Sequence, residues 1–442
     1  MNENQRDAGL VRSVGTWGLA AGIFNIVVGA GIFAVPAALA ASLGPYAPAA
    51  FLVCAIAIGS VAICFAEGGS RIPTSGGAYG YIEAAFGPLV GYVAGTLFWF
   101  ADALACGGIA AAFADVVASP LPVRWISAGR AAAIVAVIGG IALVNAGGVT
   151  RGVRLIDAAA MLKLVPLSIF VFAGAGAIRH ANFSGGVPAG SAGAGRAMIL
   201  SLFSFTGMEG PLAASGEVTR PARTIPRALA IAMVSATALY IAIQAVAQGI
   251  LGPALATSSV PLADAMARVN PALRLLLLAG AAISMFAYIS GDILGSPRML
   301  FAFGRDGLLP KFLGRLHPRS HAPYVAIFSY AALAIGFALT GTFAELAVLS
   351  TLAVSVLYIG GCAASWKLAR RGVALAGAPL NFKWLGTAAV VGIGSMLAMI
   401  ALASRAEIVG LLAMVGASAL IYVVQTRSLA ARSARGGVKT GL

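Results

Sequence analysis

Charged side chains are scarce in this sequence, since Asp, Glu, Lys and Arg together make up 10% of the 442 residues. A soluble domain averages roughly 25% charged residues. Hydrophobic residues supply 60% of the chain, and the mean hydropathy is +0.95. The composition therefore excludes a water-soluble core of this length and indicates a membrane protein.

Cysteine and histidine are also rare, which removes several kinds of chemistry. The four cysteines lie in apolar runs at unrelated spacings, so they predict neither a disulfide framework nor a metal site. The three histidines have no cysteine or carboxylate pattern around them. No nucleotide-binding loop and no Ser–His–Asp or Cys–His arrangement is present. The sequence thus predicts no enzyme, no ATP-driven pump, no catalytic residue, no metal and no cofactor.

Long apolar runs are what the chain has instead. We count twelve runs of about 20 residues, the length that crosses a bilayer, with no loop longer than about 25 residues between them. The predicted fold class is therefore an all-α membrane protein with 12 transmembrane helices. The runs cover approximately 17–41, 46–68, 88–118, 125–145, 155–178, 196–216, 226–250, 272–302, 323–341, 344–366, 384–403 and 406–426.

The basic residues that give the net charge of +15 are distributed unequally between the two sides of the membrane. If the N-terminus is cytoplasmic, 21 of the 29 Lys and Arg residues fall on the cytoplasmic side and seven fall outside. This asymmetry obeys the positive-inside rule. It predicts a multi-pass protein of the cell (inner) membrane with both termini in the cytoplasm and with membrane lipids around it. Nucleic acid is not a predicted partner.

The first run contains weak helix formers in its middle. It reads FNIVVGAGIFAVPAAL from Phe24 to Leu39, and Gly29, Gly31 and Pro36 interrupt it. In hydrocarbon each unpaired backbone group costs several kcal/mol, so a broken helix is stable only around a protein-lined cavity. The stretch therefore predicts a binding site.

The sixth run is interrupted in the same way by Gly207, Gly210 and Pro211 in SLFSFTGMEGPLAASGEV, residues 201–218. The two interruptions open consecutive groups of five runs. Such paired breaks indicate an inverted-repeat transporter with a site near the middle of the membrane. The alternative is that these glycines only allow close helix packing.

Four segments together resemble the amino acid–polyamine–organocation transporter superfamily. They are VVGAGIFAVPAAL in the first run, AEGGSRIPTSGGAYGYIEAAFGPLVGYVAG at 66–95, FSFTGMEGPLAASGEVTRPARTIPRAL at 203–229 and GSPRMLFAFGRDGLLP at 295–310. Two positions depart from that family's pattern. Ala30 stands where a serine is common, and Arg220 stands where asparagine usually precedes proline.

The resemblance implies a 5+5 inverted-repeat (leucine-transporter-like) fold in which helices 1 and 6 are broken. The implied divisions are a cytoplasmic N-terminal segment at 1–16, a first repeat at 17–178, a second repeat at 196–366, two peripheral helices at 384–426 and a cytoplasmic basic tail at 427–442.

The paired breaks predict that Gly31 and Gly207 keep the backbone open at a substrate site that also includes Gly29, and the resemblance implies a site at the same place. The substrate carboxylate would meet the N–H groups of Ala30, Gly31 and Ile32, and its ammonium would meet the carbonyls of Val27, Phe203 and Thr206. Phe203 and Phe205 would act as aromatic gates. Glu209 would lie beside the unwound sixth helix with a coupling or gating role.

Lys163 lies inside the fifth run, where ionisable groups are costly and indicate function. It either bonds to carbonyls of another helix or loses its proton. In similar proteins that carry a lysine here, it stands where sodium-coupled relatives bind a cation, which implies a coupling or gating role. The alternative is a lysine that reaches the cytoplasmic headgroups.

Asp102 and Asp292 lie deep in the third and eighth runs. Alignment to the family segments places both at the distal part of the substrate pocket. Unpaired buried charge is unfavourable, so two carboxylates there suit a substrate with a second positive group. The alternatives are pairing with basic side chains or a proton relay. Glu67 closes the second run and either joins a cytoplasmic gate or is a solvated helix end.

The sequence therefore predicts a secondary active transporter of amino acids or polyamines that works by alternating access, as a proton symporter or an exchanger. A cationic substrate is favoured. One alternative is a neutral amino acid permease in which Asp102 and Asp292 serve proton coupling. Another is a non-transporting membrane sensor built on a transporter fold.

Overall fold

The regular structure of the chain is helical over the residues that the computed structural model describes, apart from an isolated β-bridge between Val14 and Val218. The described ranges are 14–29, 31–72, 78–118, 121–147, 162–184, 191–212, 218–305, 308–375 and 379–436, without the side chains of 191–192 and 428–436. Residues 1–13 of the predicted N-terminal segment, Ala30 and residues 437–442 of the basic tail therefore lie outside the described residues.

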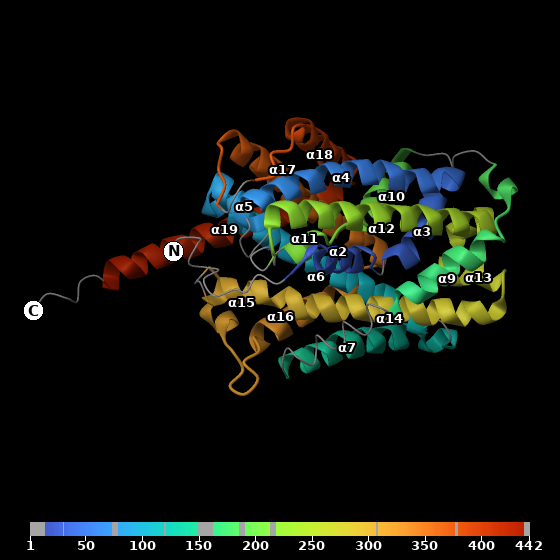
Figure 1. Ribbon diagram of the computed structural model, residues 1–442. Coiled ribbons are helices and arrows are strands. Elements are labelled where there is room, and N and C mark those ends of the chain that lie inside the picture. The colour runs from blue at the N-terminus through green and yellow to red at the C-terminus, as the bar shows by residue number, and fades with distance from the viewer. Residues whose placement is uncertain are drawn as a thin grey trace, which may run out of the picture.

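Each of the twelve apolar runs contains a described helix (Figure 1). The long helices are α4 (Ala47–Arg71), α6 (Pro88–Ala118), α7 (Val123–Ala146), α12 (Pro221–Leu251), α14 (Pro271–Gly295), α17 (Phe343–Arg370) and α19 (Arg405–Gly436). The shorter apolar helices are α2 (Thr16–Val27), α3 (Gly31–Leu43), α9 (Leu164–Ala175), α10 (Ser191–Phe203), α16 (Tyr324–Thr340) and α18 (Leu385–Ala401).

Seven helical stretches of the described chain are long and apolar enough to cross a membrane, one of them formed by α3 and α4 in succession. The chain is thus an all-α, multi-pass membrane protein, while the number of twelve crossings stays a prediction. Short helices join the long ones at the bundle ends: α5 (Ala78–Phe86), α13 (Pro261–Ala267) and α15 (Pro297–Arg305). Helix α19 leaves the bundle at the end where α5 and α15 lie (Figure 1).

The core of the bundle forms around α6, which packs against α7, α14, α16 and α17, and around α12, which packs against α2 and α4. Small residues allow this close approach, as is usual between membrane helices. On α6, for example, Gly107 faces the backbone of α16 and Gly108 faces that of α17.

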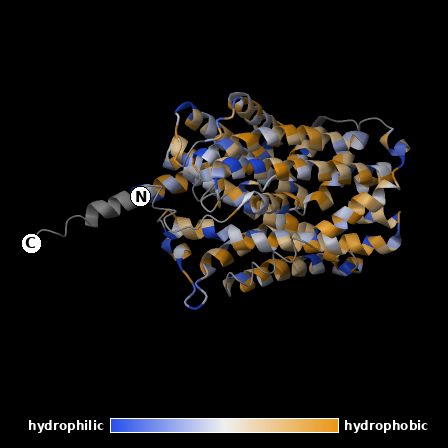
Figure 2. Cartoon of the chain, viewed as in Figure 1, coloured by the Kyte–Doolittle hydropathy of each residue, from blue (hydrophilic) through white to orange (hydrophobic). Residues whose placement is uncertain are grey.

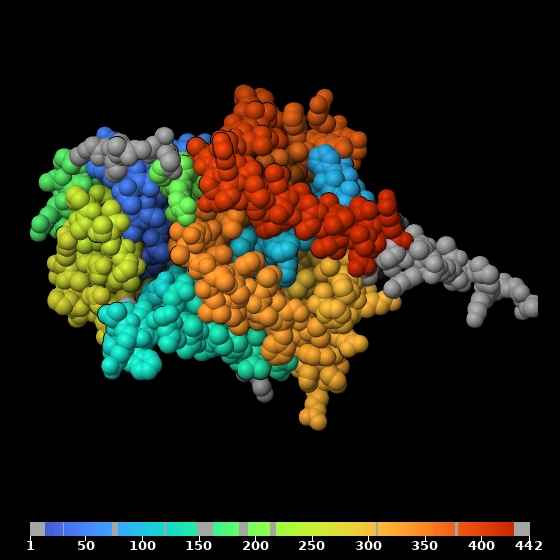
Figure 3. All heavy atoms as spheres, turned by 180° about the vertical axis from the view of Figure 1, so that it is seen from behind, coloured from blue at the N-terminus to red at the C-terminus, as the bar shows by residue number. Residues whose placement is uncertain are grey.

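Helices α18 and α19 lie at the edge of the bundle. Helix α18 packs against α4 and α17, while α19 packs against α6 and α17 and crosses the face seen in Figure 3. Large apolar side chains of α19 are exposed, including Val409 at 65% and Leu420 at 64%. Hydrophobic residues run along the helices and hydrophilic ones gather at the two bundle ends (Figure 2). This distribution fits helices surrounded by lipid.

Candidate functional site

The first helix is broken between Val27, where α2 ends, and Gly31, where α3 begins. The Val28 N–H donates to Phe24 O at 2.8 Å and the Gly29 N–H to Val27 O at 2.7 Å, so the chain leaves the helix in a tight turn. Helix α3 begins with the N–H groups of Gly31 and Ile32, which have no intrahelical acceptor. The break therefore presents donors and a positive dipole end inside the bundle.

Pro36 does not belong to this break, and its prediction as an interrupting residue is wrong. It lies buried inside α3, which continues through it. Membrane helices tolerate proline where neighbouring groups bond to the freed backbone. The carbonyl that Pro36 frees is that of Ile32, four residues earlier. The Gln244 side chain of α12 donates from Nε2 to the carbonyl of Pro36 itself at 3.4 Å, a contact that joins α3 to α12.

The sixth helix is broken between Phe203, where α10 ends, and Glu209, where the short helix α11 (Glu209–Leu212) begins. Gly207 lies in the intervening turn with φ +106°, a conformation that favours glycine. A Cβ on Gly207 would stand 2.6 Å from Ile26 Cγ2 of α2. The two breaks thus touch at this glycine. Pro211 lies within the only turn of α11, a position that proline tolerates.

A small cavity of about 20 Å³ lies between the two breaks. That volume suits about one water molecule, so the site is closed around its centre. The Phe203 ring forms one wall and would lie 3.4 Å from a Cβ on Gly31. The lining residues are Ile26, Val27, Gly29, Gly31, Ile109, Phe203, Ser204, Thr206 and Tyr288.

Two of the three carbonyls predicted to bind an ammonium, those of Val27 and Phe203, have partners within the protein. The Tyr240 hydroxyl of α12 lies 2.5 Å from Val27 O and 2.8 Å from Ser204 O, and its single proton is donated to one of them at a time. Thr206 donates from Oγ1 to Phe203 O at 2.8 Å. A substrate ammonium would therefore replace or join these hydroxyl donors.

Of the two predicted aromatic gates, Phe203 lines the cavity and Phe205 does not. Phe205 is fully buried and packs edge-on against Phe51 of α4 and Tyr240, with ring centroids 6.1 and 5.2 Å apart. Phe203 packs edge-on against Phe343 at the start of α17. The placement thus favours Phe203 as a gate and gives Phe205 a packing role.

Glu209 lies buried at the start of α11, directly after the second break. One oxygen accepts from the Gly207 N–H at 3.2 Å, and the other accepts from the Tyr358 hydroxyl of α17 at 2.8 Å. Glu209 therefore ties the unwound turn to α17. It does not line the cavity, so its contact with substrate is indirect in this conformation.

Lys163 is 4% exposed, and its Nζ donates to Asn25 O in α2, two residues before the first break. The Lys163 side chain therefore does not extend to the lipid headgroups in this structure. The amine instead connects the beginning of α9 to the last turn of α2.

Asp102 of α6 and Asp292 of α14 face each other across the Ser296 hydroxyl, which lies 2.5 Å from Asp102 Oδ2 and 3.2 Å from Asp292 Oδ1. The Tyr330 hydroxyl of α16 donates to Asp292 Oδ2, and the Cys106 side chain lies against Asp292. No Lys or Arg of the described chain forms an ion pair with either carboxylate. The sequence signal that could have found Ser296 is its i+4 spacing from Asp292.

The carboxylate pair lies near the cavity without lining it. On α14, Tyr288 lines the cavity and Asp292 follows it at i+4, on the same face and about 6 Å further along the axis. Trp99 of α6 packs edge-on against Tyr330 at 5.8 Å, and its buried indole N–H has no partner among the described residues. A group of aromatic and acidic side chains therefore lies next to the cavity, one turn further along α14.

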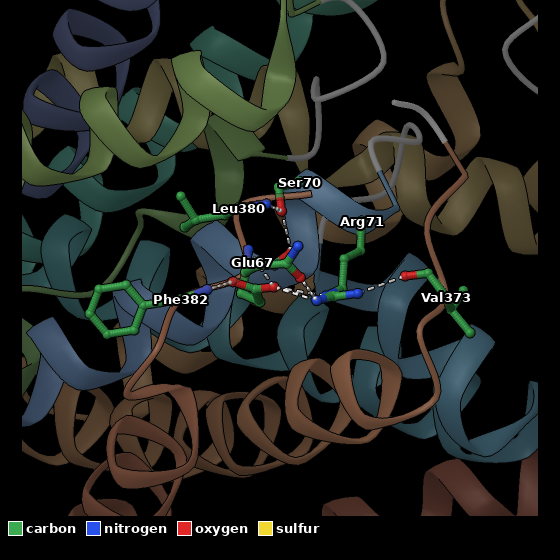
Figure 4. A network of polar contacts seen from close by, with 7 residues as sticks. Glu67, Ser70, Arg71, Val373, Leu380 and Phe382 are labelled. Atoms are coloured by element: carbon green, nitrogen blue, oxygen red, sulfur yellow. Dashed lines mark hydrogen bonds and ion pairs between the residues drawn. The ribbon is translucent and has the colours of Figure 1, made fainter. Parts of the chain in front are cut away.

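Glu67 is fully buried, so the interpretation as a solvated helix end is wrong. It pairs with Arg71 one turn later on α4, with Oε1 2.7 Å from Nη2, and accepts the backbone N–H groups of Asn381 and Phe382 (Figure 4). Arg71 donates to Val373 O at 3.0 Å. The pair thus holds the connection between α17 and α18 against the end of α4.

A larger cavity of about 430 Å³ opens at the surface between the end of α7 and the loop before α16. It is lined by Ala146, Gly147, His317, Arg319, Ser320, Tyr324 and Phe328, none of which is a predicted site residue. The breaks, with their buried donors and acceptors, remain the candidate functional site.

Two broken helices that meet at a buried cavity inside a multi-pass helical bundle are features of membrane transporters rather than enzymes. Residues 14–424 match the amino acid permease family, and the chain belongs to this family. The chain is 32% identical to an uncharacterized transporter of Mycobacterium tuberculosis over 344 residues, 75% of this chain and 74% of the relative.

Two relatives from Bacillus subtilis have substrates in their names. A methylthioribose transporter is 25% identical over 372 residues, 80% of this chain and 81% of the relative. A branched-chain amino acid permease is 26% identical over 371 residues, 78% of this chain and 77% of the relative. These two relatives are therefore named for different substrates.

Proposed function

We propose that this protein is a secondary active transporter of amino acids, with a positively charged side chain favoured, that works by alternating access. The observation that carries the proposal is the meeting of the two breaks, where Gly31 at the start of α3 lines one small cavity together with Val27 and Phe203. A zwitterion needs both kinds of group, donors for its carboxylate and acceptors for its ammonium. Because the cavity is small, substrate entry requires Phe203 or Tyr288 to move.

The preference for a cationic side chain rests on Asp102 and Asp292. Both are partly buried, lie beside the cavity and have no basic partner among the described residues. A charge pair at about 4 Å gains roughly 4 kcal/mol at an effective dielectric near 20. Desolvation of both partners offsets part of this gain. The aromatic rings of Trp99 and Tyr330 would add attraction for a cation.

A neutral amino acid permease is the second candidate, and a different observation favours it. Asp102 and Asp292 have hydroxyl partners in Ser296 and Tyr330, and neither carboxylate lines the cavity. In that case the pair would carry protons for coupling, by symport or exchange. The branched-chain substrate named for one relative agrees with this candidate.

Equilibrium binding separates the two candidates. Lysine, putrescine and leucine are titrated into the purified wild type and the Asp102→Asn and Asp292→Asn variants, with the exposed Asp115→Asn as the control. A cation subsite predicts that both variants weaken lysine and putrescine binding by about 10- to 100-fold, or roughly 1.4 to 2.8 kcal/mol, and leave leucine unchanged. Wild-type binding of leucine at least as tight as that of lysine, unaltered in both variants, would support the neutral permease.

The membrane orientation belongs to the same proposal. We expect a cell membrane location with both termini in the cytoplasm, which the distribution of basic residues supports. The divisions at 17–178 and 196–366 as inverted repeats are supported by the corresponding places of the two breaks. Lys163, Glu209 and Glu67 are the proposed coupling or gating residues. Transport would be driven either by symport with protons or by exchange for another substrate molecule.

A further inference from the structure

Ser204 is a buried hydroxyl with an unmet hydrogen bond at the wall of the site cavity. It is 4% exposed and follows directly after α10, in the turn of the second break. Its backbone carbonyl is near the Tyr240 hydroxyl, but its Oγ has no partner in the described part of the chain. The side chain is therefore available to a ligand.

An unpaired hydroxyl destabilises a folded protein, so its presence calls for a reason. The described residues contain eleven other buried side-chain atoms without a partner, but Ser204 is the one of these residues that lines the cavity. Thr206 lines the same cavity, yet its hydroxyl is already donated to Phe203 O. Ser204 thus supplies a buried, unpaired hydroxyl at this place.

The hydroxyl of Ser204 lies close to the first residue of α3. A Cβ on Gly31 would stand 3.8 Å from Ser204 Oγ. The first N–H groups of α3 have no intrahelical acceptor and favour an anion. Position 30 of the sequence is alanine, whose side chain has no hydroxyl to offer a carboxylate.

We propose that Ser204 is a substrate-binding residue that donates its hydroxyl to one oxygen of the substrate carboxylate, while the N–H groups of Gly31 and Ile32 bind the other. The second broken helix thereby replaces a hydroxyl that the first one lacks. The inference deepens the proposed function and rests on it only for the carboxylate end of the substrate. It is independent of what Asp102 and Asp292 bind.

The test compares an amino acid with the amine that lacks its carboxylate. Lysine and cadaverine form one pair, and leucine and 3-methylbutylamine form the other. Ser204→Ala should weaken binding of the amino acid by about 10- to 100-fold, the usual range for a hydrogen bond to a charged group, and leave the amine unchanged. Ser204→Thr keeps a hydroxyl and should retain most of the amino acid affinity. Ser201→Ala is the matched control, because Ser201 is equally buried and unpaired but does not line the cavity.

Folding and function can be told apart in the same experiment. Removing an unpaired hydroxyl should leave the melting temperature of the ligand-free Ser204→Ala variant unchanged or raised. Equal losses for amino acid and amine, or unchanged amino acid binding, would overturn the role of Ser204 alone. If the wild type binds none of the four ligands, the proposed function fails together with this inference.

Discussion

Glu67 and Arg71 stand one helical turn apart on α4 and form an ion pair in which both side chains are buried. Arg71 donates to the Val373 carbonyl, and Glu67 accepts from the N–H groups of Asn381 and Phe382. One pair therefore fixes both ends of the connection between α17 and α18. Such a pair is stable only while both partners remain, because either charge alone would be buried without compensation.

Glu67→Gln should therefore lower the stability strongly. The amide keeps the size of the side chain but leaves the Arg71 charge unpaired, a change that typically costs about 3 to 5 kcal/mol. The matched control is Asp115→Asn, which removes the same charge from a pair whose Asp side chain is 60% exposed. That change should stay within about 1 kcal/mol. Thermal unfolding of both variants in detergent is the measurement, and equal melting temperatures would contradict a structural role for the buried pair.

Gly207→Ala should impair both stability and substrate binding. The left-handed backbone conformation is unfavourable for alanine by about 1 to 2 kcal/mol, and the added Cβ would meet Ile26 at 2.6 Å. Gly139→Ala in the middle of α7 is the control, because no side chain stands within 4 Å of that Cβ. It should be neutral or stabilise by up to about 1 kcal/mol. Retained substrate affinity in Gly207→Ala would show that the turn has no role in the site.

Lys163→Ala should remove the pH dependence of transport. A charged amine is a stronger donor to Asn25 O than a neutral one, so protonation would strengthen the link between α9 and α2 beside the first break. The measurement is uptake into liposomes over a range of pH values, with the exposed Lys383→Ala as the control. A wild-type pH profile in Lys163→Ala would assign the lysine to packing.

Arg220→Gly should stabilise the protein. Arg220 directly precedes α12 as its N-cap residue and has φ 45°, in the left-handed region. The resembled family usually has asparagine at this position. Asparagine and glycine tolerate this region better than arginine does. The expected gain is about 0.5 to 1 kcal/mol. Arg223→Gly, inside α12, is the opposite control and should cost about 1 kcal/mol. Destabilisation by both substitutions to the same extent would refute the conformational explanation.

The sequence predicted the places of the two breaks because glycine leaves a direct signature in an apolar run. It could not show that Pro36 lies within α3, because membrane helices can continue through a proline and the residue type alone does not say which case applies. It could not show either that Phe203 lines the cavity and Phe205 does not, because an unwound turn has no regular period that assigns side chains to a face. Ser204 has no distinctive signal in sequence, as serine next to a break is common.

The sequence also could not show whether a charged residue at the end of an apolar run is buried or solvated. Glu67 at the end of an apolar run is indistinguishable from a solvated residue until the connection from 379 to 382 is seen over it. By contrast, the functional prediction for Lys163, Asp102 and Asp292 came from their depth in the runs, which needs no tertiary contact. Their partners Asn25, Ser296 and Tyr330 come from other helices or later turns and required the fold.

The Tyr240 hydroxyl lies between Val27 O of the first break and Ser204 O of the second. A cation that binds either carbonyl must compete with the Tyr240 hydroxyl. Binding of a substrate in the cavity would therefore change a hydrogen bond made by α12. Tyr240 is 19 residues beyond Pro221, where that helix begins, which corresponds to about 28 Å along the helix axis. A fluorescent or spin label at the exposed Arg220 would then serve as a remote sensor of substrate, read at the membrane surface without modifying the site itself.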